Sequence, residues 1–154
     1  MSVPRNYFED FTVGDAFDHP RGKTVSDVEG VLLTNLFMNT AQSHFNEDFM
    51  SKTRFGTRLV FGGVTASLII GLAMEDTGGS ALMELSLDRM RFLAPVHYGD
   101  TLYALSLVLS KEETPGEQTG AVVFRHYGFN QAGTCVFEGE RQALFAKRES
   151  GDYG

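Results

Sequence analysis

Apolar residues recur at helical or strand spacing along most of the chain, and one stretch is apolar on almost every side. Positions 64–74, in the second half of residues 55–76, read VTASLIIGLAM. A helix without a polar face is buried in a protein core, and this run is shorter than the about 20 apolar residues that cross a bilayer. We therefore expect a buried core helix that stops at Gly78 and Gly79, with Gly71 at a packing contact.

The pattern before this helix predicts a second, shorter one. Ser26 and Glu29 have the spacing of a capping box, and apolar residues follow at helical spacing to near Met38. Residues 39–46 are interpreted as an ordered loop, and residues 47–51 as one helical turn. Upstream, residues 11–24 predict a turn at Gly14 and a short strand that is broken at Pro20.

After the central helix, four strand-like runs fill residues 83–147. In the first run the alternation of apolar and polar residues changes phase, which predicts a β-bulge near Asp88 and Arg89. In the second, the apolar residues 103, 105, 107 and 109 share one face. A helix followed by an antiparallel meander indicates an α+β fold in which the sheet wraps around the helix. A two-fold partner would protect a sheet edge, so we expect a homodimer or a higher homo-oligomer.

Composition narrows the class of protein. We expect one domain over residues 1–154, and the net charge of −7 argues against a nucleic-acid-binding surface. The one cysteine, Cys135, suits a reducing cytoplasm, and the first residues contain no apolar segment of a secretory signal. We expect a soluble cytoplasmic protein that does not bind a membrane. Because metal-ligand and nucleotide-loop patterns are absent, we expect neither a metal nor a cofactor.

Gly62 and Gly63 stand at the start of the predicted core helix. The first amide N–H groups of a helix have no partner within it and lie at the positive end of the helix dipole. They could therefore stabilise an oxyanion that develops during a reaction. A tight turn into a buried helix is the simpler explanation of the same two glycines, and both interpretations stay open at this point.

Several strings, in this order and spacing, resemble the MaoC-like hydratases of the hotdog fold, which act on acyl-CoA thioesters. They are YFEDF at 7–11 with VGD at 13–15, TRFG at 53–56, FGGVTASL at 61–68 and APVHYGDTL at 94–102. The resemblance covers residues 7–147. The string NTAQSHFN at 39–46 is most similar to the subgroup of mesaconyl-CoA and β-methylmalyl-CoA hydratases, whose substrates carry a second carboxylate and whose chains are typically a double hotdog.

The resemblance also implies site residues. The family pairs an Asp with a His five residues later, with an Asn between them, and the matching positions here hold Asn39, Ala41 and His44. The family's His-Gly at the helix entrance is here Phe61 and Gly62. We expect His44 to be the acid–base residue, because imidazole titrates near neutral pH, whereas Asn39 cannot accept a proton.

Basic residues beside this region are candidates for binding the substrate. Lys52, Arg54 and Arg58 stand close together in an acidic chain and could bind a CoA phosphate or a carboxylate. Phe61 is included among the expected substrate contacts. A solvated positive edge is an equally good interpretation of the basic run. Arg89 and Arg91 are alternative anchors for a substrate carboxylate.

Three functions remain open from the sequence. The first is a hydratase or dehydratase acting on a short-chain or dicarboxylic enoyl-CoA, with CoA present only as part of the substrate. The second is an acyl-CoA thioesterase, which would need Glu47 or Asp48 as its carboxylate. The third is a non-catalytic acyl-CoA-binding hotdog subunit, because Asn39 replaces the family's acid.

Overall fold

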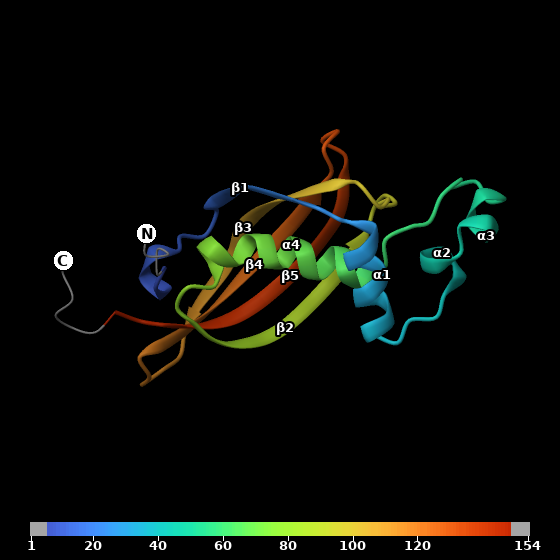
Figure 1. Cartoon of the computed structure of the whole chain (residues 1–154). Coiled ribbons are helices and arrows are strands. Elements are labelled where there is room, and N and C mark those ends of the chain that lie inside the picture. Colours follow the sequence, from blue (N-terminus) through green and yellow to red (C-terminus); the bar gives the residue numbers. More distant parts are fainter. Residues whose placement is uncertain (1–5, 149–154) are drawn as a thin grey trace.

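The computed structural model describes residues 6–148, so both ends of the expected domain range, 1–5 and 149–154, lie outside it. The helices lie in the first half of the chain and four of the five strands follow in the second half, as the sequence predicts (Figure 1). The elements are η1 (Phe8–Asp10), β1 (Ala16–Thr24), α1 (Asp27–Leu36), α2 (Gln42–Phe45), α3 (Glu47–Ser51), α4 (Gly62–Thr77), β2 (Ala81–Phe92), β3 (Thr101–Glu113), β4 (Thr119–Phe129) and β5 (Cys135–Ala146).

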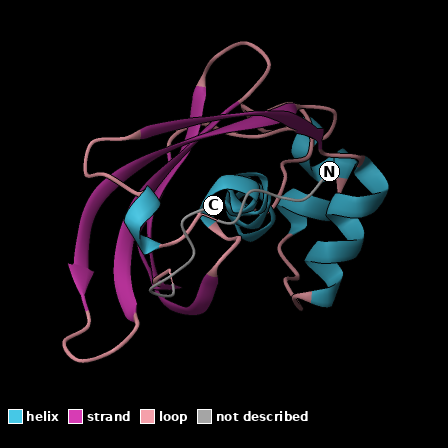
Figure 2. Cartoon of the chain, turned by 90° about the vertical axis from the view of Figure 1, so that its left-hand side faces the viewer, coloured by secondary structure: helices cyan, strands magenta, loops and turns pink. Residues whose placement is uncertain are grey.

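The five strands form one antiparallel sheet that curves around α4 (Figure 2). The strand order is β1-β3-β4-β5-β2, so β1 and β2 are the two edges. The sheet covers one side of the helix, and α1 lies on another side near the helix's N-terminal end (Figures 1 and 2). The expected α+β fold, with a sheet wrapped around a central helix, is confirmed.

The central helix α4 begins at Gly62 and ends at Thr77, followed by Gly78 as predicted, but it is not buried all round. Val64, Ile69 and Ala73 are buried against the sheet. A stripe at four-residue spacing, Ser67, Gly71 and Glu75, is exposed. The expectation of a packing contact at Gly71 is wrong within this chain, since a Cβ added there would meet no atom within 4 Å. The open sheet covers only part of the helix circumference.

Alternate residues of β3 face the core and the outside of the sheet. In β3 the buried residues include Leu102, Ala104 and Val108, whereas the alternate residues at 103, 105, 107 and 109 are half-buried or exposed. The helix approaches β4 closely enough that a Cβ added at Gly128 would lie 2.6 Å from Ile69. A side chain at position 128 would push the helix away, so glycine permits this close contact between α4 and β4.

The edge strands show one confirmed and one wrong prediction. The register of β2 against β5 shifts between Asp88 and Arg91, and Arg89 has a φ of 50°, as expected for the predicted bulge. Pro20, in contrast, does not end β1, which continues to Thr24 with an irregularity between His19 and Lys23. Proline is tolerated on an edge strand because its missing N–H can face away from the ladder.

Helix α1 is where it was predicted, with Ser26 capping the amide of Glu29. However, it packs through its small residues, Gly30 and Thr34, while the apolar residues 28, 32 and 36 are exposed. A Cβ added at Gly30 would lie 2.3 Å from the Tyr98 ring, so glycine permits this close approach. The segment expected to be a loop at 39–46 contains the short helix α2, and the predicted turn at 47–51 is α3.

Candidate active site

A pocket of about 490 Å³ lies at the N-terminal end of α4. It brings together six of the eight residues that the sequence singled out, although they come from separate parts of the chain. These are Asn39, His44, Arg54, Phe61, Gly62 and Gly63. The pocket is the size expected for part of a small-molecule ligand, and its lining combines few polar groups with mainly apolar side chains.

His44 is the titratable imidazole of this pocket. It lies in α2, and its Nδ1 is 2.9 Å from the backbone oxygen of Leu59. A carbonyl oxygen only accepts hydrogen bonds, so Nδ1 carries a proton and Nε2 is the unprotonated nitrogen of the neutral ring. The Phe61 ring contacts the imidazole with a centroid separation of 5.5 Å. The bond to Leu59 thus holds the imidazole in the tautomer in which Nε2 can accept a proton.

Gly62 and Gly63 line the same pocket, and within residues 6–148 their backbone amides have no hydrogen-bond partner. The amides of Val64 and Thr65 donate to the oxygen of Phe61, so the amides of Gly62 and Gly63 precede the first hydrogen bonds of α4. Large side chains cover the two glycines closely, and an added Cβ would lie 2.5 Å from the Phe61 ring at Gly63 and 2.9 Å from the Phe92 ring at Gly62. Glycine is therefore required for this arrangement of backbone and aromatic rings.

Asn39 lines the pocket with only part of its side chain free. Its Oδ1 accepts a hydrogen bond of 2.9 Å from the amide of Ala41, which identifies that atom as the oxygen and leaves the Nδ2 amino group as the donor available to a ligand. The side chain can therefore donate to a water or to a carbonyl oxygen. It offers no group that removes a proton.

The three basic residues expected to bind substrate have different surroundings. Arg54 is exposed at the pocket and its guanidinium lies 4.7 Å from the centre of the Phe55 ring. Lys52 pairs with Asp48 at 2.7 Å on the outside of α3. Arg58 points the other way, into ion pairs with Asp27 and Glu47, and neither Lys52 nor Arg58 lines the pocket.

Other carboxylates and arginines considered from the sequence also lie elsewhere. Glu47 and Asp48 are engaged in the ion pairs just described and do not line the pocket. Arg89 and Arg91 face a separate hollow of about 200 Å³ with Arg125, where they pair with glutamates of β5. The pocket thus contains Arg54 as its one guanidinium within the described residues.

The sequence did not identify most of the apolar wall. Residues 92–96, together with Phe55, Leu59, Val60, Thr65 and Val136, complete the lining. Residues 94–96 belong to a string already noted, APVHYGDTL, which was a usable signal for part of this wall. Val136 is in β5, 59 residues after the end of α4, and no local pattern connects it with the pocket.

None of the helices within residues 6–148 has the length and apolar character to cross a membrane. In the same part of the chain, His, Cys, Asp and Glu side chains do not gather in groups of three or more that could hold a metal ion.

Comparison with known families and relatives gives a consistent result. The family model described as mesaconyl-CoA hydratase matches residues 5–147. A mesaconyl-CoA hydratase of Haloarcula marismortui is 35% identical over 96% of this chain and 44% of its own length. An (R)-specific enoyl-CoA hydratase of Rhodospirillum rubrum is 30% identical, and the match covers 93% of this chain and 94% of the relative. This chain therefore spans less than half the length of the Haloarcula relative.

Solved structures agree on the fold. A putative MaoC domain protein dehydratase from Chloroflexus aurantiacus superposes with a TM-score of 0.88 at 28% identity, over 95% of this chain and 46% of that one. A Mycobacterium tuberculosis protein, Rv0216, described as a double hotdog fold, has a TM-score of 0.81 at 22% identity, over 100% of this chain and 48% of that one. The sheet wrapped around α4 is thus a hotdog fold.

Proposed function

The chain belongs to the mesaconyl-CoA hydratase family of MaoC-like proteins, and on that premise we propose that it adds water to, or removes it from, an enoyl-CoA thioester. The proposed substrate class is a short-chain or dicarboxylic enoyl-CoA. The observation that carries the proposal is that His44, with Nδ1 bonded to Leu59, lines the same pocket as the free amides of Gly62 and Gly63.

In the proposed reaction His44 performs both proton transfers. Nε2 removes a proton from water while the water oxygen bonds to the β-carbon, and the electrons of the double bond move toward the thioester oxygen. The protonated ring then delivers that proton to the α-carbon, so that one water molecule is added and the imidazole is restored. A single imidazole acts from one side, and both new bonds therefore form on the same face of the double bond.

The remaining polar groups are assigned to binding and charge stabilisation. The amides of Gly62 and Gly63 donate to the enolate oxygen, and one such donor is typically worth about 3 kcal/mol in the transition state. Asn39 Nδ2 donates to the attacking water or to the thioester carbonyl. Arg54, exposed at the pocket and next to Phe55, binds a carboxylate or phosphate of the substrate. We propose no cofactor apart from the CoA that the substrate carries.

A test with two substrates separates this proposal from its alternatives. Mesaconyl-CoA and crotonyl-CoA are incubated with the protein, and the absorbance of the conjugated thioester and the release of free thiol are followed together. Loss of absorbance without thiol supports hydration. Thiol release would instead indicate a thioesterase, and binding without either change would indicate a non-catalytic acyl-CoA-binding subunit.

Variants of two histidines then assign the base. His44→Gln should lower kcat by roughly 10²–10⁴-fold, the usual contribution of general acid–base catalysis, and His97→Gln is the matched control because His97 does not line the pocket. Unchanged turnover in His44→Gln would refute the assignment. Deuterium from D₂O should enter the α-carbon on the face that receives the hydroxyl, which is a further check on the use of one imidazole.

We propose that the assembly is a homodimer or higher homo-oligomer. The edge strand β2 and the residue after it expose several large apolar side chains in the isolated chain, namely Leu82, Met83, Leu85, Leu87, Met90, Phe92 and Leu93. An exposed apolar edge of this kind is normally covered by another sheet. Light scattering should give at least twice the chain mass, and Leu85→Glu should reduce it; a monomeric wild-type protein would contradict the proposal. The single cysteine favours a cytoplasmic location.

A further inference from the structure

The segment that carries His44 lies outside the sheet. Residues 39–58, with α2 and α3, lie beyond the end of the sheet and beside α1 (Figure 1). Where the chain leaves this segment, the amide of Leu59 donates to the oxygen of Ser43 within the segment at 2.9 Å. The amide of Val60 donates to the oxygen of Val96 in the main body at 2.8 Å. A segment with so little support from the sheet needs side-chain contacts to keep an orientation.

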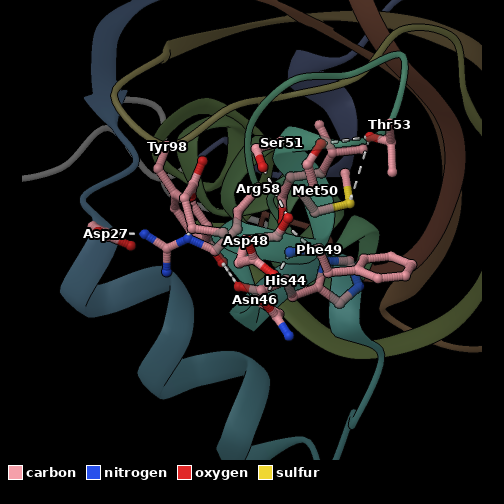
Figure 3. A network of polar contacts seen from close by, with 12 residues as sticks. Asp27, His44, Asn46, Asp48, Phe49, Met50, Ser51, Thr53, Arg58 and Tyr98 are labelled. Carbon is pink, nitrogen blue, oxygen red and sulfur yellow. Dashed lines mark hydrogen bonds and ion pairs between the residues drawn. The ribbon is translucent and has the colours of Figure 1, made fainter.

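Arg58 supplies such contacts from the end of the segment. Its Nε donates to Glu47 Oε2 at 2.7 Å and its Nη2 to Asp27 Oδ2 at 2.8 Å. Glu47 is the first residue of α3 and Asp27 the first of α1, so one guanidinium joins the N-terminal ends of two helices. The Arg58 side chain is only 20% exposed, and its guanidinium lies 5.3 Å from the centre of the Tyr98 ring (Figure 3).

These contacts converge on His44 through neighbouring residues. Leu59, next to Arg58 in the chain, accepts the Nδ1 proton of His44 on its backbone oxygen. Tyr98, which packs against Arg58, donates its hydroxyl to the backbone oxygen of His44 at 3.2 Å. The imidazole and the peptide of His44 are thus both bound by groups that Arg58 holds in place.

The charge around Arg58 argues against a direct role in binding CoA. Its guanidinium is shared by two carboxylates, so the three groups together carry a net charge of −1, which does not attract a phosphate. Hydrogen bonds between charged groups at 2.7–2.8 Å are among the stronger ones in proteins. The fork geometry of arginine suits two separate carboxylates better than the point charge of lysine does.

We propose that Arg58 is a positioning residue: its ion pairs with Glu47 and Asp27 fix the segment 39–58 so that His44 keeps Nδ1 on Leu59 and Nε2 free for catalysis. The catalytic part of this proposal rests on the proposed function, because it needs His44 to be the acid–base residue. The structural part, that Arg58 fixes the tautomer of His44, is independent of the proposed function. A displacement of about 1 Å in a catalytic group can lower a rate by about 10²-fold.

The test uses full-length Arg58→Met, with Arg58→Lys as the conservative variant and Arg21→Met as the matched control. Arg21 forms an exposed ion pair with Glu75 of α4 and loses the same charge on substitution. ¹⁵N-histidine NMR, at a pH about two units above the ordinary histidine pKa of about 6.5, reports which ring nitrogen carries the proton. The His44 signals are assigned by their absence in His44→Gln.

In the wild type and in Arg21→Met, His44 should be the Nδ1–H tautomer alone. In Arg58→Met it should exchange between both tautomers, and kcat should fall by about 10- to 100-fold while KM changes less than about threefold. Arg58→Lys should recover part of both effects. An unchanged His44 tautomer in Arg58→Met, in a variant that is folded by circular dichroism, overturns the proposal whatever the activity. Mixed tautomers together with an active His44→Gln would keep the positioning role and refute the catalytic one.

Discussion

Replacing Glu84 by alanine should destabilise the protein more than replacing Arg141 by methionine, although Glu84 is half exposed and Arg141 is fully buried. Arg141 of β5 donates to both carboxylate oxygens of Glu84 in β2, at 2.6 and 2.7 Å. Its third nitrogen donates to the backbone oxygen of Thr77 at 2.9 Å. The side chain of Arg141 is 0% exposed and that of Glu84 is 51% exposed. The pair joins the edge strand to the C-terminal end of α4.

The expected magnitudes follow from what each substitution leaves behind. Glu84→Ala leaves a guanidinium buried with only the Thr77 oxygens as partners, and breaking a buried ion pair on one side typically costs about 3–5 kcal/mol. Because Thr77 still accepts a hydrogen bond, we expect about 3 kcal/mol. Arg141→Met removes the buried charge, returns Glu84 to water and fills much of the space with a flexible apolar chain. Its main cost is the lost bond to Thr77, about 1–2 kcal/mol.

Urea unfolding at one protein concentration measures both values. The double variant Glu84→Ala/Arg141→Met should be close to Arg141→Met alone, since the alanine has no buried charge left to expose. Glu84→Gln, which keeps a hydrogen-bond acceptor, should lie between the wild type and Glu84→Ala. Equal losses in the two single variants, or a larger loss in Arg141→Met, would refute the reasoning that the unpaired buried charge dominates.

Two further predictions concern other buried contacts. Burial, and next the charges of Arg141 and His19, lower the pKa of His126 to about 3. Between about pH 6.5 and 3 the unfolded chain therefore binds a proton at His126 that the folded chain does not bind. The free energy of unfolding falls as the pH decreases through this range. His126→Gln should reduce the slope of unfolding free energy against pH by up to about 1.4 kcal/mol per pH unit. The slope is measured by urea unfolding from pH 6 to pH 4, and equal slopes for the wild type and the variant would contradict the prediction. Gly30→Ala should lower kcat, because the added Cβ lies 2.3 Å from the ring of Tyr98, whose hydroxyl donates to the backbone oxygen of His44. It should not raise stability, because overpacking by about 1–3 kcal/mol offsets the roughly 1 kcal/mol gain in helix propensity. A more stable variant with unchanged kcat in the hydration assay would contradict this prediction.

Much of the candidate site was accessible from the sequence because its residues belong to short strings with local meaning. A glycine pair at a helix start exposes backbone donors in any fold, and the position of His44 relative to the 39–46 string carried the family resemblance. The apolar wall was not accessible in the same way. Val136 reaches the pocket only because β5 pairs beside β2 and curves around α4, and such contacts depend on the whole sheet.

Arg58 illustrates a second limit. In the sequence it belongs to a basic run, and such a run is equally compatible with phosphate binding or with solvation. Its partners are 31 and 11 residues away, and only the folded chain places Asp27 and Glu47 on either side of it. The same holds for Glu47, which was a candidate carboxylate for a thioesterase and is instead paired with Arg58 outside the pocket.

By itself, the sequence determined helices α1 and α4, the strands that follow α4, the cap at Ser26, the bulge at Arg89 and the net charge, because these depend on residues close together in the chain. Tertiary structure alone decided which face of each element is buried. Helix α1 packs through Gly30 and Thr34 while residues 28, 32 and 36 are exposed, and β3 buries Leu102, Ala104 and Val108 rather than residues 105, 107 and 109. Part of the reason is steric: neighbouring elements approach most closely where a glycine such as Gly30 or Gly128 meets a side chain, and hydrophobic periodicity does not report where that happens.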